Sequence, residues 1–165
     1  MNKRTRQYLG LLSAVAAYYL IHEGAHLLYA LAMGVFKQIN IMGLGIQIDI
    51  YADRLTTTQL GIFCLVGAVA TQLAAYLLTA LSPTICRFRS KLLRAVCYYI
   101  TIALLLLDPI YLSVLCGLVG GGDMNGIAYL IPAATARTGF GILLLINGAV
   151  FWKAVLPCYQ RSFTD

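Results

Sequence analysis

Four long apolar runs constrain the fold of this chain more than any other feature of its sequence. They cover about residues 8–35, 57–81, 95–119 and 139–156. About 20 mainly apolar residues are enough for a helix to cross a bilayer. Of the 165 residues, 61% are hydrophobic and 11% are charged, whereas a soluble domain is about half apolar and a quarter charged. We therefore expect one integral membrane domain over residues 1–165, an all-α bundle of about four transmembrane helices.

The formal net charge of +6 comes from basic residues that gather beside the apolar runs. They precede the first run or follow the second: Lys3, Arg4, Arg6, Arg87, Arg89, Lys91 and Arg94. This distribution fits anchoring at lipid headgroups and signals of membrane orientation better than nucleic-acid binding. The expected partner of these residues is the lipid bilayer, and no nucleic-acid partner is expected.

The stretch over residues 36–53 changes from helical to alternating hydrophobicity. Ile39 and Ile41 alternate with polar neighbours, and a second alternating set, from residue 44 to residue 50, has the opposite phase. The phase changes at Gly43-Leu44-Gly45, so the pattern predicts a small β-hairpin after the first helix. An ordinary surface loop is the alternative. A hairpin here would pack on the bundle near the membrane surface, and its edge strand could pair with an extended substrate segment.

The second and third runs carry residues that are unusual at membrane depth. Small residues dominate the second run, which indicates close helix packing, and Gln72 there needs a partner inside the bundle. The third run is interrupted by Asp108-Pro109. Residues 120–126 then predict a flexible, broken stretch, followed by a short apolar segment over residues 127–134. We expect this part to form a short broken helix that is buried in protein or faces water.

The chemical signal lies inside the first run, at His22-Glu23-Gly24-Ala25-His26. On a helix, His22 and His26 lie one turn apart on one face, where two imidazoles reach a single metal ion. Glu23 is placed to act as a general base on a water in that site, as in HExxH metalloproteases. The alternative is a satisfied polar cluster without metal. Because the flanking residues are apolar and ionisable groups are costly in a membrane, we favour a metal site.

A hydrolytic zinc site needs a third protein ligand, and elimination leaves two candidates. The chain has no other histidine and no other glutamate, and its remaining aspartates lie in the predicted hairpin or at residue 165. Asp123 is favoured because glycines surround it and let the backbone bend, while Asp108 is the alternative ligand or an orienting partner for a histidine. Asp123 could instead cap a helix that begins at about Ile127. The five cysteines form no CxxC pair and are read as small buried hydrophobes.

Together these features resemble the site-2 protease family of intramembrane zinc metalloproteases. The resemblance spans nearly the whole chain and rests on residues 22–26, the hairpin, the small-residue helix with its segment 66–72, and Gly122-Asp123-Met124-Asn125-Gly126. It implies Zn²⁺ held by His22, His26 and Asp123, with Glu23 as the catalytic residue. The chain departs from the family's usual Asn-Pro and Leu-Asp-Gly signature, in whose place stand Asp108-Pro109 and Gly122–Gly126.

The expected function is hydrolysis of a peptide bond in or next to a transmembrane segment of a membrane protein substrate. Asn125 is a candidate cavity or substrate contact. A catalytically inactive zinc-binding scaffold is the alternative, and an ion carrier ranks last. Lysine and arginine counts place the N-terminus in the cytoplasm and the hairpin outside, whereas the resemblance implies the reverse, so both orientations stay open. Small size and the resemblance suggest a multi-pass protein of a bacterial cell membrane.

Overall fold

A computed structural model describes residues 2–42, 45–118, 120 and 122–164, and shows a mostly helical chain with one small sheet. The elements in chain order are α1 (Lys3–Ala32), β1 (Phe36–Met42), β2 (Gly45–Ile50), η1 (Ala52–Arg54), α2 (Thr57–Ile85), α3 (Lys91–Ser113), η2 (Leu115–Gly117), α4 (Gly122–Ile127), α5 (Ala133–Val150), η3 (Phe151–Val155) and α6 (Leu156–Thr164).

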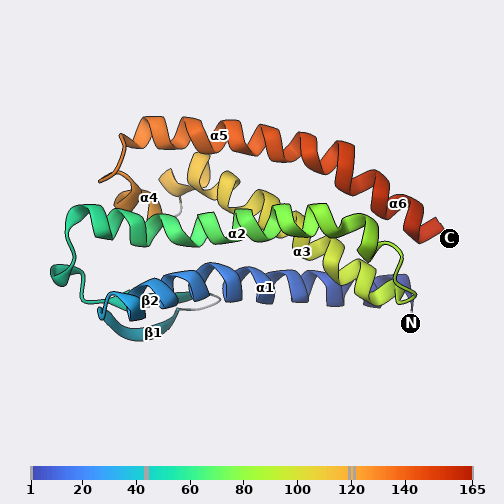
Figure 1. Ribbon diagram of the computed structural model, residues 1–165, viewed down its shortest axis with the longest axis horizontal. Helices are drawn as coiled ribbons and strands as arrows, with labels where there is room; N and C mark the ends of the chain where they lie inside the picture. Colours follow the sequence, from blue (N-terminus) through green and yellow to red (C-terminus); the bar gives the residue numbers. More distant parts are fainter. Residues whose placement is uncertain (1, 43–44, 119, 121, 165) are drawn as a thin grey trace.

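The long helices run lengthwise side by side, with α3 in contact with α1, α2 and α5 (Figure 1). The hairpin and α4 lie at one end of this bundle, called the hairpin end. The start of α1, the connection between α2 and α3, and α6 lie at the other end (Figure 1). Parts of the chain that are far apart in sequence therefore meet at each end.

Polar side chains at the helix starts satisfy backbone N–H groups that have no helical partner. Asn2 Oδ1 accepts a hydrogen bond from the Thr5 amide at 2.8 Å, and this contact caps α1. Thr56 and Gln59 form a reciprocal capping box at the start of α2. Ser90 caps α3. These contacts fix where each helix begins.

The hairpin predicted from alternation is present. At the end of α1, Gly34 has a φ of +66°, and the Val35 amide donates to the Ala30 carbonyl at 2.9 Å. The chain then enters two antiparallel strands in which Ile39 faces Ile48. Gly43 and Leu44 lie outside the described residues. Ile48 is buried in the same core cluster as Ala30 and Val35, so the hairpin packs against the end of α1.

Three helices are long and apolar enough to cross a membrane: Thr57–Ile85, Lys91–Ser113 and the continuous helix Ala133–Phe163. The last of these is longer than the span expected over residues 139–156. Helix α1 is not among them, because tyrosines and residues 22, 23 and 26 lower the hydropathy of its apolar run. The expected number of about four spans is therefore not confirmed, and a span over residues 8–35 stays a prediction.

Helix α3 continues through Asp108 and Pro109 to Ser113, so the interruption predicted there does not occur. Pro109 has no N–H group, which leaves the Leu105 carbonyl without its helical donor. The side chain of Asn147 on α5 replaces that donor at 2.6 Å. Asn147 also donates to Gln72 Oε1 at 2.7 Å, and this confirms the expected buried partner for Gln72.

The region after α3 is also more regular than its glycines predict. Residues 122–127 form α4, and α5 begins at Ala133. Because α4 ends at Ile127, Asp123 does not cap a helix that starts there; it lies in the first turn of α4 itself. Val119 and Gly121 lie outside the described residues.

Candidate metal centre

The centre begins with two buried histidines on α1. His22 and His26 are 5% and 3% exposed, and their Nε2 atoms lie 3.2 Å apart. The alanines and leucines around them favour a helix, and helical periodicity puts residues four apart on the same face. Both rings therefore point into the bundle from one stripe of α1, as the sequence predicts.

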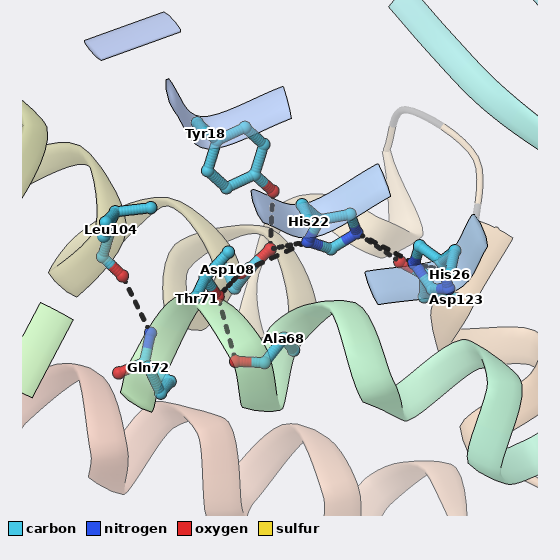
Figure 2. A network of polar contacts seen from close by, with 9 residues as sticks. All are labelled: Tyr18, His22, His26, Ala68, Thr71, Gln72, Leu104, Asp108 and Asp123. Carbon is cyan, nitrogen blue, oxygen red and sulfur yellow. Dashed lines mark hydrogen bonds and ion pairs between the residues drawn. The ribbon is translucent and has the colours of Figure 1, made fainter. Parts of the chain in front are cut away.

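Asp123 reaches the same point from 101 residues farther along the chain. Its Oδ2 atom lies 3.2 Å from His22 Nε2, and its Oδ1 atom lies 3.7 Å from His26 Nε2 (Figure 2). Close packing of α4 on α2 makes this approach feasible: a Cβ atom on Gly126 would lie 2.2 Å from Cys64 Sγ. Only a residue without a side chain allows the two helices to come this near.

Gly67 on α2 forms the floor beneath both imidazole rings. A Cβ atom at this position would lie 2.5 Å from His26 Nε2 and 2.8 Å from His22 Nε2. Such distances are far below van der Waals contact, so even alanine would displace the rings. The sequence predicts a packing role for Gly67, and the packing it permits is against the histidines themselves.

Asp108 lies on the other side of His22, away from Asp123. Its carboxylate oxygens are 3.2 and 3.4 Å from His22 Nδ1. The Tyr18 hydroxyl donates to it at 2.5 Å, and the Thr71 hydroxyl also donates to it (Figure 2). Side chains from α1 and α2 thus hold this carboxylate in place. Asp108 is placed to orient His22, which is the second of the two roles that the sequence left open for it.

The contact with Asp108 determines how His22 presents its other nitrogen. If Nδ1 carries the proton that Asp108 accepts, Nε2 offers a lone pair toward His26 and Asp123. A lone pair, a carboxylate and a second imidazole then face one another, and this is unfavourable unless a proton on His26 Nε2 or a cation lies between them. A metal ion satisfies the arrangement, and so does an imidazolium at His22 that donates to both carboxylates. These two states are the metal site and the metal-free cluster considered from the sequence.

The donor set fits a small divalent ion. Tetrahedral zinc with bonds of about 2.0–2.1 Å places its ligand atoms about 3.3 Å apart. Here the two Nε2 atoms are 3.2 Å apart, Asp123 Oδ2 lies 3.2 Å from His22 Nε2, and the other carboxylate oxygen, Oδ1, lies 3.7 Å from His26 Nε2. With one ligand atom taken from each residue, the three atoms lie within 4.8 Å of one another. Three protein ligands also leave the fourth position open for water, as catalytic zinc sites require. His22, His26 and Asp123 can therefore hold a metal ion as a group.

Glu23 lies beside this cluster, on the side of the hairpin. The backbone of Ile48 in β2 lies near its carboxylate, which also interacts electrostatically with His26, His22 and Asp123. The hairpin thus lies beside the residue that the sequence singled out as a general base. Asn125, the candidate cavity contact, is exposed on α4 and forms no part of the described cluster.

Tyr18 and Thr71 were not singled out from the sequence as site residues. Thr71 follows Gly67 by one helical turn, so the i, i+4 spacing of two small residues marks the face of α2 that contacts the site. The Tyr18 ring stacks on His22, with centroids 5.3 Å apart, one turn before it on α1. That spacing is a usable signal for an aromatic residue packed beside His22.

Comparisons with protein-family models, with curated proteins and with solved structures find no match to this chain. Any functional assignment therefore depends on the residues and geometry of the site.

Proposed function

We propose that this chain is an intramembrane zinc metalloprotease, similar to the site-2 protease family, that hydrolyses a peptide bond in or next to a transmembrane segment of a substrate protein. The observation that carries the proposal is the convergence of His22, His26 and Asp123, whose ligand atoms all lie within 4.8 Å of one another. Two of these residues are buried and come from one helix, and the third comes from a distant element. Chance surface clusters rarely combine these properties.

Zinc held by these residues would polarise the scissile carbonyl and lower the pKa of a water molecule in the site. Glu23 accepts the proton of the attacking water and transfers it to the leaving amine nitrogen. The Ile48 backbone of the hairpin lies near this carboxylate, beside the cluster. Asp108 fixes the ring orientation of His22 and takes no direct part in the proton transfer.

The position of the site along α1 supports cleavage within a membrane segment. His22 precedes the end of α1 at Ala32 by ten residues, about 15 Å along a helix. In a bilayer core about 30 Å thick, a site at that distance from a helix end lies well inside the apolar region. Asp123 is still 21% exposed, and this gives water a polar path to the site from the α4 side.

The hairpin provides a means to hold the substrate backbone. A transmembrane helix must unwind before it is cut, because its carbonyls are hydrogen-bonded within the helix. Strand β1 lies at the edge of the two-stranded sheet, and β2 makes most of the sheet's contacts with α1. Ile39 and Ile41 of β1 are 51% and 78% exposed. An unwound segment could pair with the free edge of β1, in the same sheet as β2, whose Ile48 lies near Glu23.

Zinc content tests the metal centre. The purified parent protein should bind about one zinc ion per chain, Asp123→Ala should bind almost none, and Asp49→Asn, which removes a carboxylate from the hairpin surface, should bind as the parent does. Mass spectrometry of the metal measures the ratio. A parent without zinc, or an Asp123→Ala protein with full zinc, would overturn the ligand assignment.

Cleavage is tested on all membrane proteins of a cell at once, so that no particular substrate has to be chosen. Cells expressing the parent are compared with cells expressing Glu23→Gln, and new N-termini within transmembrane segments are counted by mass spectrometry of the membrane proteome. The Gln variant should retain zinc and produce none of the parent's cleavage products. A parent with full zinc whose products match those of the Gln variant would show a zinc-binding scaffold without protease activity.

A further inference from the structure

The end of the bundle opposite the hairpin carries a concentration of positive charge. Eight basic residues lie on the start of α1, the α2–α3 connection, the start of α3 and α6: Lys3, Arg4, Arg6, Arg87, Arg89, Lys91, Arg94 and Arg161. We call this part the basic end.

The basic end contains a cleft of about 900 Å³ between α1, α3 and α6. Lys3 and Arg6 from α1 and Arg161 from α6 contribute its cations. Its apolar lining includes Tyr98 from α3 and Leu156 from α6. Leu156 lies five residues before Arg161, about 7 Å deeper along the helix. The lining therefore changes from cationic at the end of the bundle to apolar farther in.

The α6 wall of this cleft is held in place by buried contacts. Arg94 is 7% exposed, and its guanidinium donates to the backbone carbonyls of Cys86 and Ser162, which ties α3 to the end of α2 and to α6. Tyr159 is 1% exposed, and its ring lies 5.1 Å from that of Tyr98. The cleft is thus a fixed feature of the packed helices.

Its position matches the level of lipid headgroups. The helix Lys91–Ser113 begins here and the helix Ala133–Phe163 ends here, and both are long and apolar enough to span a membrane. Basic pockets between spanning helices bind anionic headgroups, and arginine is suited to phosphate because its fork donates several hydrogen bonds. An acyl chain needs an apolar surface directly below the phosphate, and the Tyr98 and Leu156 side provides one.

We propose that this cleft is a binding site for one anionic phospholipid, with the headgroup phosphate at Lys3, Arg6 and Arg161 and the acyl chains along the α3 and α6 walls. The inference does not depend on the proposed protease activity. It requires only that the basic end meets the membrane surface. A free phosphate ion shares the headgroup chemistry but makes no use of the apolar wall.

The test measures thermal unfolding of the purified protein in detergent with added lipid. Phosphatidylglycerol should raise the Tm of the parent, and phosphatidylcholine with identical acyl chains should raise it much less. The cleft variant Lys3→Gln/Arg6→Gln/Arg161→Gln should lose the phosphatidylglycerol-dependent shift. The control Arg87→Gln/Arg89→Gln/Lys91→Gln removes the same charge from the same end, outside the cleft, and should keep the shift.

Three outcomes would overturn the proposal: equal shifts with both lipids, equal losses in the two triple variants, or full stabilisation of the parent by inorganic phosphate alone. If the triple cleft variant does not fold, Lys3→Gln takes its place, because Lys3 is an exposed residue at the start of α1. This single change should weaken the apparent affinity for phosphatidylglycerol about fivefold. An unchanged affinity would also contradict the proposal.

Discussion

The bundle has two halves, one nearer the hairpin end, called the hairpin half, and one nearer the basic end. The buried polar groups of the two halves have different partners. In the hairpin half, His22, His26 and Asp123 face one another, and His26 Nδ1 is buried with no hydrogen-bond partner among the described residues. In the other half, Gln72 and Asn147 bond each other and the carbonyls of Leu104 and Leu105. In the hairpin half, ligand atoms face one another. In the other half, Gln72 and Asn147 pair donors with acceptors, while Arg94 Nε and the Tyr159 hydroxyl have no hydrogen-bond partner among the described residues.

The boundary between the two arrangements runs between two neighbouring residues of α2. Thr71 donates to Asp108, which orients His22, whereas Gln72 donates to the Leu104 carbonyl (Figure 2). A buried polar group paired with a backbone carbonyl is explained by folding alone, because leaving either partner unpaired is costly. The convergence of His22, His26 and Asp123 is compatible with hydrogen bonds among these groups and also with a metal ion. The comparison thus separates polar residues that pair with backbone carbonyls from the cluster for which we propose a function.

The largest expected effect is that of Gly67→Ala on metal binding. The added methyl group would lie within 2.8 Å of both imidazole Nε2 atoms, so the rings must turn away from Asp123. Zinc affinity, measured by competition with a chelator of known affinity, should fall at least about 100-fold, beyond the loss typical for residues that only orient a ligand.

The matched control for this change is Gly24→Ala, which makes the same substitution between the two histidines. A Cβ atom at Gly24 meets nothing within 4 Å, and alanine is favoured over glycine in a helix by about 1 kcal/mol. Zinc affinity should stay within about twofold of the parent. If Gly67→Ala binds zinc as well as Gly24→Ala does, the two rings above Gly67 are not the metal site.

Asp108→Asn should have a smaller effect on the same measurement. The amide keeps the size of the carboxylate but is a weaker acceptor for His22 Nδ1, so His22 loses part of its orientation. We expect zinc affinity to fall about 10- to 100-fold, the usual cost of losing such a partner. The stoichiometry at saturating zinc should stay near one. If Asp108→Asn removes zinc as completely as Asp123→Ala, Asp108 is itself a ligand.

Asn147→Leu tests the paired polar groups in the half near the basic end. It removes the donor to the Leu105 carbonyl, which Pro109 frees, the donor to Gln72 Oε1 and the acceptor for the Tyr76 hydroxyl. The free energy of unfolding should fall by about 2–4 kcal/mol, since several buried polar groups lose their bonds together. Zinc affinity should change less than twofold. A large loss of zinc affinity in a variant that remains folded would show that the two halves are coupled.

The sequence predicts those parts of the structure that depend on local periodicity. The alternation of hydrophobic residues that includes Ile39 and Ile48 was sufficient to predict the hairpin. The helical spacing of His22 and His26 was sufficient to predict that they lie together. Asp123 could be proposed because few carboxylates exist to choose from. Whether Asp123 binds zinc remains a prediction.

Features that depend on how distant helices pack could not be predicted. The continuity of α3 through Pro109 relies on Asn147, 38 residues later in the chain, which replaces the missing donor. The role of Gly67 depends on how closely α2 approaches α1, and no local pattern specifies that distance. The low hydropathy of α1 comes in part from His22, Glu23 and His26, so a span over residues 8–35 remains a prediction.

The smallest expected effect is that of the exposed ion pair of the hairpin on local stability. This pair lies in the hairpin half but outside the group formed by His22, His26 and Asp123. Lys37 Nζ lies 2.9 Å from Asp49 Oδ2. The lysine lowers the pKa of Asp49 below its usual 3.8, and the aspartate raises the pKa of Lys37 above its usual 10.5. The stabilisation should be fully present between these usual values. It should be lost as pH falls through the lowered pKa of Asp49 or rises through the raised pKa of Lys37.

Protease cleavage within the hairpin measures this effect. At pH 7 and low salt, Asp49→Asn should be cut slightly faster than the parent, and the difference should shrink in high salt, which screens exposed pairs. At a pH below the lowered pKa of Asp49, an acid-stable protease should cut both proteins equally. Zinc binding at pH 7 should be identical in the two. If zinc affinity also changes when the ion pair is removed, the hairpin surface is energetically coupled to the His22, His26 and Asp123 site. That result would contradict the independence of the two that we expect.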